Sequence, residues 1–144
     1  MITWAITIDC RDPERLGRFW ATALGYVEAP APVGFAGWKA WYDHFDVAAE
    51  ERGGPGALVD PHGHGPQLGF LPVPEPKTVK NRLHLDLKVG GGRLVDWKVR
   101  WPRVLAEVDR LVVAGATVVR RYDHDDRGDH VLMADPEGNE FCVV

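Results

Sequence analysis

The sequence predicts an α+β domain made of two tandem βαβββ modules, which form a curved mixed sheet (two half-barrels) with one helix per module on the outer face. Three observations predict this fold. The length of 144 residues suits a single domain. The order strand, helix, strand, strand, strand occurs twice, in residues of about 1–76 and about 80–144. Matching landmark residues punctuate the two halves in the same order, and the concave face of the sheet is left free to line a cavity.

The composition is that of an ordinary globular chain, with 45% hydrophobic and 26% charged residues, so disorder and coiled coil are excluded. The net charge of −4 argues against nucleic acid and anionic membranes as partners. No apolar run approaches the roughly 18–20 residues that cross a bilayer. With only Cys10 and Cys142 and no signal-peptide pattern at the start, we expect a reduced, cytoplasmic protein.

The first half opens with β-branched residues at 2–8, which predict a strand. Asp12 is the expected N-cap of a helix over residues 13–24, because proline and an acidic residue occupy its first turn and Gly25 follows its end. Residues 38–46 are read as a strand because aromatic residues are enriched there. The further extended segments expected in this half are residues 26–28, 57–59 and 67–73.

The second half repeats this order. Pro102 is expected to open the second helix, which ends at Gly115. Trp97 and Trp101 then precede that helix, in a segment that the first half lacks. The strands expected in this half are residues 82–89, 116–121, 129–134 and 140–144.

Three kinds of landmark match between the halves: a helix-opening proline, a helix-ending glycine and an Asp-Pro turn. The matched pairs are Pro13 with Pro102, Gly25 with Gly115, and Asp60 with Asp135. The alternative is an ordinary α+β sandwich in which these matches are coincidental. We favour the internal repeat because the landmarks keep the same order.

Several longer motifs carry a resemblance to a known family. They are the Asp-Pro start and Phe-Trp end of residues 12–20, Leu24-Gly25-Tyr26, Val73-Pro74-Glu75-Pro76-Lys77, residues 80–87 with Leu83-His84-Leu85-Asp86-Leu87, and residues 135–142 with Asp135-Pro136-Glu137-Gly138-Asn139. The chain resembles the glyoxalase/bleomycin-resistance/dioxygenase (vicinal oxygen chelate) superfamily, and its glyoxalase-like branch in particular. The resemblance covers nearly the whole chain. It implies a cavity for a small molecule inside the paired modules, and a homodimer.

The resemblance also implies where a metal binds in relatives that hold one. By motif matching, the four positions are Ala5, Gln67, His84 and Cys142. Alanine has no donor atom, and Cys142 replaces the hard carboxylate of the family pattern with a softer sulfur. Gln67, His84 and Cys142 therefore remain as an incomplete metal site, and a cavity without a bound cofactor is the favoured expectation.

His84 and Asp86 are two residues apart on a predicted strand, so both side chains point to one face. They can act as general base and orienting carboxylate, or as part of a metal shell. The alternative is a polar pair that satisfies backbone groups. Glu140 shares a face with Cys142 and completes the candidate catalytic set of His84, Asp86 and Glu140.

The expected cavity lining in the first half is Ala5 and Thr7 on the first strand, with Trp38 and Tyr42 on the aromatic segment. The aromatic residues can instead belong to a core or a dimer interface. His124 is placed in a charged loop, and both His124 and His130 lie outside the expected ligand positions.

These observations favour a glyoxalase-like protein that binds a small molecule and has an incomplete metal site. A metal-dependent lyase, isomerase or dioxygenase is the first alternative, with a divalent metal as its cofactor. A metal-free module that sequesters a drug or mediates an interaction is the second. The net charge gives only weak support to a cationic ligand.

Overall fold

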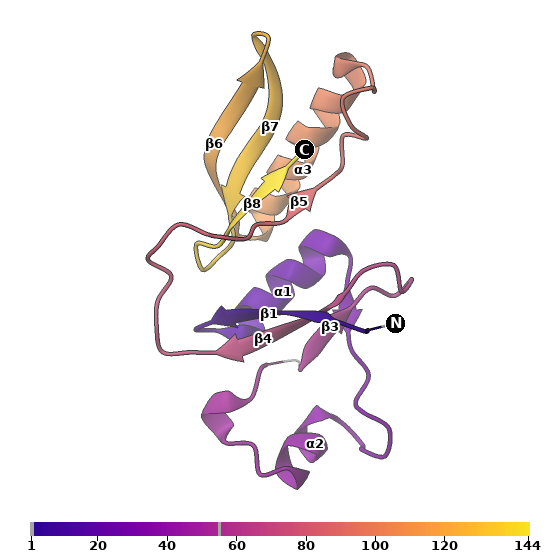
Figure 1. Cartoon of the computed structure of the whole chain (residues 1–144), viewed down its shortest axis with the longest axis vertical. Helices are drawn as coiled ribbons and strands as arrows, with labels where there is room; N and C mark the ends of the chain where they lie inside the picture. The colour runs from indigo at the N-terminus through magenta and orange to yellow at the C-terminus, as the bar shows by residue number, and fades with distance from the viewer. Residues whose placement is uncertain (1, 55) are drawn as a thin grey trace. The chain divides into compact units, whose positions relative to one another are not determined.

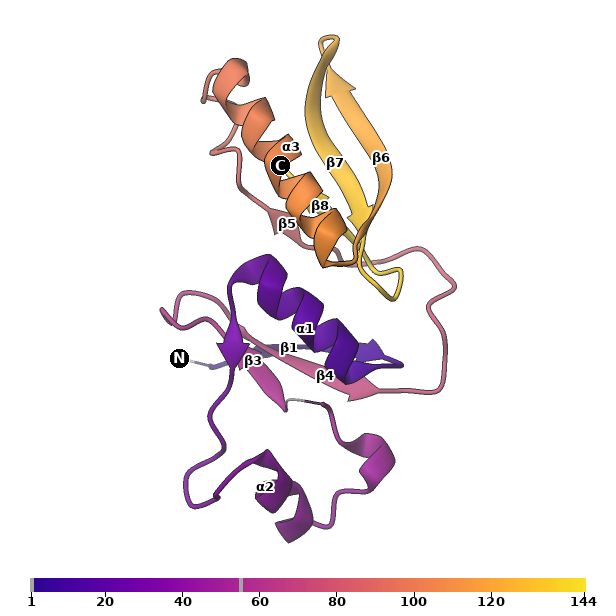
Figure 2. The ribbon, with the colours of Figure 1, turned by 180° about the vertical axis from the view of Figure 1, so that it is seen from behind.

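The computed structural model describes residues 2–54 and 56–144 and divides the chain into two compact units, Met1–Pro76 and Lys77–Val144 (Figure 1). Each unit has a four-stranded mixed sheet and a long helix that covers one face of that sheet (Figure 2). The predicted α+β fold of two tandem βαβββ modules is confirmed.

The first unit is built around a sheet of order β1-β4-β3-β2, in which β1 and β4 are parallel and the other pairs antiparallel. Helix α1 packs on β4 and β3 through the buried side chains of Leu16, Phe19 and Trp20. In chain order the elements are β1 (Ala5–Cys10), α1 (Pro13–Leu24), β2 (Val27–Glu28), α2 (Trp38–His44), the 3₁₀ helix η1 (Ala49–Glu51), β3 (Ala57–Val59) and β4 (Gln67–Pro72).

The second unit has the equivalent strand order β5-β8-β7-β6, again with one parallel pair, β5 with β8. Its helix α3 buries Val104, Val108 and Leu111 toward the sheet. The elements are β5 (Asp86–Leu87), α3 (Trp97–Ala114), β6 (Thr117–His124), β7 (Arg127–Ala134) and β8 (Glu140–Val143). Over the described residues, none of the helices combines the length and the apolar character that a membrane span requires.

The matched landmark residues have the same structural role in both halves. Gly25 and Gly115 both end their helices in the left-handed region, with φ of 68° and 116°, where glycine carries no steric penalty. The carboxylates of Asp60 and Asp135 both accept backbone N–H groups of the turn that follows. The repeat is therefore present in the backbone geometry as well as in the sequence.

The prediction of a strand at residues 38–46 is wrong, because Trp38–His44 forms helix α2. Lys39 forms an ion pair with Asp43 at 2.6 Å, the spacing of one helical turn. The aromatic residues of this segment also recur at helical spacing: Trp38, Trp41, Tyr42 and Phe45. Aromatic enrichment suggested a strand, whereas the spacing of the same residues fits a helix.

The start of the second helix is also earlier than predicted. Helix α3 begins at Trp97, and Pro102 lies inside it. Asp96 is the N-cap, since its side chain accepts a backbone N–H of the first turn at 2.8 Å. The extra turn is fixed by tertiary contacts: the indole of Trp97 donates to the Gly128 carbonyl at 2.9 Å, and Trp101 is buried. These contacts compensate for the free energy lost because Pro102 cannot donate a backbone hydrogen bond inside the helix.

Further boundaries differ from the sequence expectation. The first strand, expected at residues 2–8, is observed at Ala5–Cys10. The strand expected at 82–89 is reduced to Asp86–Leu87, so His84 lies just before β5. The charged segment around His124 is not a loop, because His124 ends β6 and pairs with Arg127 of β7. Asp125 and Asp126, with φ of 50° and 58°, form the tight turn between these strands.

Candidate ligand cavity and metal-donor group

A cavity of about 690 Å³ lies in the second unit, and every residue that lines it belongs to that unit. Its volume is in the range of small-molecule sites. The lining comes from β5, the glycine-containing loop that follows it, α3, β7 and β8. The lining residues are His84, Asp86, Lys88, Gly91, Gly92, Arg93, Arg100, Asp129, His130, Cys142 and Val144.

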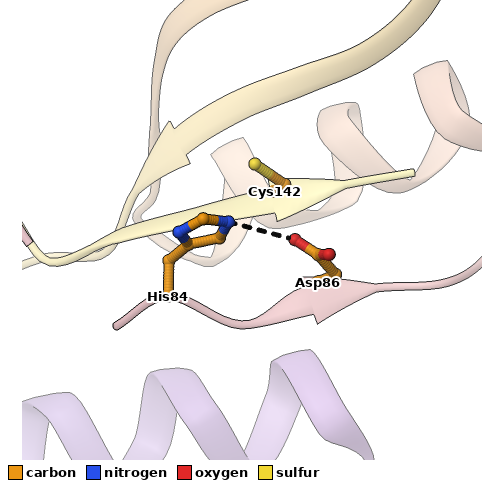
Figure 3. A group of neighbouring side chains, drawn as sticks. All are labelled: His84, Asp86 and Cys142. Atoms are coloured by element: carbon orange, nitrogen blue, oxygen red, sulfur yellow. Dashed lines mark ion pairs between the residues drawn. The ribbon is translucent and has the colours of Figure 1, made fainter. Parts of the chain in front are cut away.

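Three potential metal donors converge in this cavity (Figure 3). Asp86 of β5 is in register with Cys142 of β8, and His84 lies two residues before Asp86. His84 Nε2 and Asp86 Oδ1 are 3.4 Å apart. The donor atoms of His84, Asp86 and Cys142 all lie within 4.8 Å of one another. The sequence-predicted pair of His84 and Asp86 is thus brought together with the predicted ligand Cys142.

The three side chains differ in exposure. Those of His84 and Asp86 are 49% and 46% exposed, whereas Cys142 is buried. Burial raises the pKa of the Cys142 thiol, and the nearby Asp86 carboxylate raises it further, against an opposing effect of Lys80. The thiol is therefore protonated at neutral pH, and a bound metal has to displace its proton.

The chemistry of the donor set fits a transition metal. An imidazole nitrogen, a carboxylate oxygen and a thiolate sulfur are the ligands that zinc uses in proteins. Three protein donors leave a coordination position open, as in catalytic zinc sites. The sulfur makes the set softer than the family pattern, which has a carboxylate at the Cys142 position.

The remaining predicted metal and cavity positions of the sheets lie on β1 and β4 of the first unit. Ala5 is in register with Gln67, and Thr7 with Gly69. Ala5, Thr7 and Gln67 are exposed and lie on the sheet face opposite α1. Their roles in ligand binding stay predictions.

Glu140 forms an ion pair within the second unit. Its carboxylate pairs with the Lys80 ammonium, and its backbone N–H donates to Asn81. Glu140 lies two residues before Cys142 on β8, but it is not among the residues that line the cavity. Its predicted catalytic role stays a prediction.

Trp38 and Tyr42 lie on helix α2 instead of a strand. Trp38 donates its indole N–H to the Ala29 carbonyl at 2.9 Å, and Tyr42 donates its hydroxyl to the Gly53 carbonyl at 3.2 Å. Burial raises the pKa of Tyr42. Both polar groups thus anchor the helix to its own unit, and a ligand-facing role stays a prediction.

A second group of cavity residues was missed by the sequence analysis. Asp129 is almost fully buried and accepts hydrogen bonds from Arg93 at 2.9 and 3.3 Å and from Arg100 at 3.2 Å. Arg100 also donates to the Asp129 backbone carbonyl. Arginine hydrogen bonding, led by Arg93, holds the pKa of Asp129 well below its usual range despite the opposing effect of burial.

His130 is the other missed residue, and it lines the cavity beside Asp129. Its Nδ1 lies 3.0 Å from Asp129 Oδ2, and its ring stacks on Tyr122 at 4.6 Å. Because an ionised carboxylate only accepts, Nδ1 carries a proton, and in the neutral imidazole Nε2 is then the acceptor. The Asp-His dipeptide is the sequence signal for this pair, but its place in the cavity depends on the fold.

The tandem modules define the fold of a protein of the vicinal oxygen chelate type, and the candidate donor group lies in the cavity of its second unit. The model of the glyoxalase-like domain matches residues 5–144, so the chain belongs to that family. No curated protein sequence matches the chain.

Solved structures support the same fold. An enzyme of the glyoxalase/bleomycin resistance protein/dioxygenase family from Burkholderia phytofirmans has 17% identity and a TM-score of 0.58, covering 96% of this chain and 94% of its own. A mutant of the fosfomycin resistance protein FosX from Listeria monocytogenes, complexed with Mn(II) and 1S,2S-dihydroxypropylphosphonic acid, has 11% identity and a TM-score of 0.59, covering 99% and 91%. FosX from Mesorhizobium loti has 14% identity and a TM-score of 0.56, covering 99% and 92%. At these identities the similarity establishes the fold alone.

Proposed function

We propose that this glyoxalase-like protein binds a small organic molecule in the cavity of the second unit, beside an incomplete form of the family's metal site. One observation carries the proposal: His84, Asp86 and Cys142 bring their donor atoms within 4.8 Å of one another among the residues that line a 690 Å³ cavity. The Mn(II) complex of the structurally similar FosX adds support for a metal.

Each residue has an assigned part in this proposal. His84, Asp86 and Cys142 hold a divalent cation, which when bound polarises oxygen atoms of the ligand. Within the second unit, Glu140 stays the acid-base candidate from the sequence. For the first unit, the sequence candidates are proposed as they stand, with Gln67 as a metal donor and four residues as ligand contacts: Ala5, Thr7, Trp38 and Tyr42. A homodimer is proposed because the family resemblance implies one, and a cytoplasmic location because the chain has only two cysteines, Cys10 and Cys142.

Cobalt(II) titration tests the metal site. We expect the wild-type protein to bind one equivalent of cobalt and to show a sulfur-to-cobalt charge-transfer band in the near ultraviolet. Cys142→Ser removes this band because it removes the thiolate. His84→Ala weakens cobalt binding by at least about tenfold, since even residues outside the ligand shell have effects of that size. Absorbance and metal content of the protein are the measurements.

Two variants serve as matched controls. Cys10→Ser changes the other buried cysteine, and His124→Ala changes an exposed histidine at the end of β6. Both should leave the charge-transfer band unchanged. A wild-type protein without the band, or a Cys142→Ser protein that keeps it, contradicts the metal site and favours the metal-free, ligand-sequestering alternative.

A second candidate function, catalysis of the lyase, isomerase or dioxygenase type, is favoured by His130. A histidine whose Nδ1 is hydrogen bonded to a carboxylate has its Nε2 available to accept a proton. In this chain Asp129 provides that carboxylate, and His130 lines the cavity that contains the donor group. A base next to a metal-polarised ligand is the arrangement that such reactions use.

Substrate screening tests this second function. We expect turnover of an α-ketoaldehyde with a thiol, or of a catechol with oxygen, to fall about 10²- to 10⁴-fold in His130→Gln, which removes the base. Cobalt binding should be kept, because His130 is not among the metal donors. His64→Ala, at an exposed turn histidine, is the control for turnover. Full turnover in His130→Gln assigns the proton transfer to another group.

A further inference from the structure

The second-unit cavity also holds basic side chains that the proposed metal group does not use. Lys88, Arg93 and Arg100 line it, together with the carboxylates of Asp86 and Asp129. Asp86 belongs to the metal-donor group, and Asp129 accepts hydrogen bonds from both arginines. A ligand in this cavity therefore meets cations although the net charge of the chain is −4.

Lys88 lies close to the metal-donor group along the chain. Asp86 of that group is paired with Cys142, and Lys88 follows Asp86 by two residues. The backbone turns at Lys88, because the Val89 N–H donates to the Leu87 carbonyl at 3.0 Å. Two residues of chain span at most about 7 Å, and both Lys88 and the donor group line the same cavity. One small molecule is therefore long enough to contact both.

The cations differ in how far they are already used by the protein. Arg100 is only 11% exposed, and both of its terminal nitrogens donate to Asp129. Arg93 is 68% exposed and uses Nε and Nη2 on Asp129. Over residues 2–54 and 56–144, Arg93 Nη1 and the Lys88 ammonium have no protein partner. Arg100 thus supports Asp129, whereas Lys88 and Arg93 have donors to spare for a ligand.

We propose that Lys88 and Arg93 bind an anionic group of the ligand, which makes the ligand a small organic anion with a carboxylate, phosphate or phosphonate. This inference rests on the proposed function, because it assigns the ligand class of the same cavity. Arg93 presents planar donors that suit an oxyanion, and Lys88 adds a mobile point charge. Asp129 orients Arg93 through two hydrogen bonds, which use Nε and Nη2 and leave Nη1 for the ligand.

Anion binding by metal-free protein tests the proposal. Inorganic phosphate and acetate are titrated separately into chelator-treated full-length protein by calorimetry, so that no metal contributes. We expect saturable binding of at least one anion, weakened about tenfold or more in Lys88→Met, as for the loss of a charge-assisted hydrogen bond. A preference for phosphate or acetate distinguishes a tetrahedral from a planar oxyanion group. Lys98→Met is the matched control, because Lys98 is exposed on α3 and is not among the cavity-lining residues.

The outcomes separate this inference from the metal site. Absence of saturable binding in the wild type, or equal affinity of Lys88→Met and the wild type, overturns the anion proposal. Lys88→Met should keep the cobalt charge-transfer band, since Lys88 is not a metal donor. A wild-type protein that binds phosphate but not cobalt contradicts the metal site alone. A wild-type protein that binds cobalt but neither phosphate nor acetate contradicts the anion site alone.

Discussion

Asp129→Ala is expected to lower the free energy of unfolding by about 3–5 kcal/mol, the range for removal of one partner from a buried ion pair. The side chain is 8% exposed and accepts hydrogen bonds from Arg93, Arg100 and His130. Its removal leaves the guanidinium of Arg100, itself 11% exposed, without a counter-charge. Urea unfolding of the full chain, followed by circular dichroism, measures the loss.

Asp123→Ala is the matched control for this substitution. Asp123 also pairs with an arginine, Arg121 at 2.8 Å, but both side chains are 53% exposed. Exposed ion pairs contribute about 0–1 kcal/mol. A loss in Asp129→Ala no larger than that of Asp123→Ala contradicts a structural role for the buried pair.

The same carboxylate gives the protein a pH dependence with a defined sign. The pKa of Asp129 is held well below its ordinary value of 3.8 in the folded protein. Its contribution to stability is therefore complete above that value and is lost as the pH falls below it. Wild-type stability should decline more steeply with acid than that of Asp129→Ala, and parallel curves contradict this assignment.

Phe141→Ala is expected to destabilise the second unit by about 3–5 kcal/mol, as large-to-small substitutions in protein cores do. Phe141 is fully buried on β8, next to Cys142 in the chain. Because successive strand residues point to opposite faces, Phe141 packs away from the face that carries Cys142. Loss of this ring leaves a void in the core under the donor group, and chemical denaturation measures the effect.

Val113→Ala provides the surface comparison for this prediction. Val113 is on α3 and is 90% exposed. Substitutions of this kind usually change stability by about 0.5 kcal/mol or less. Equal destabilisation by Phe141→Ala and Val113→Ala contradicts the placement of Phe141 in the core.

The repeat could be predicted from sequence because its signals are local. Gly25 and Gly115 end helices through their own backbone freedom, and Asp60 and Asp135 organise turns through neighbours a few residues away. At residues 38–46 the aromatic residue types favour a strand, whereas their spacing fits helix α2, which forms over Trp38–His44. The true start of α3 depends on the burial of Trp101, which no local pattern contains.

The residues of the candidate site also differ in whether a local sequence signal predicts them. His84 and Asp86 were predicted from a spacing of two residues, and Cys142 from its position in a family motif. Asp129 and His130 were not predicted as site residues, because their setting depends on distant chain segments. Arg93 reaches Asp129 across 36 residues and Arg100 across 29. Such pairings form only when the chain folds, so no local sequence pattern indicates them.

The two units share a strand order but carry their extra residues at different connections. In the first unit α2 and η1 lie between β2 and β3, where the second unit has a tight turn between β6 and β7. In the second unit the extra residues lie between β5 and α3, which residues 88–96 separate. Gly91, Gly92 and Arg93 of that connection line the 690 Å³ cavity. The repeated strand framework thus accepts added segments at different places, and the segment after β5 forms part of the cavity wall.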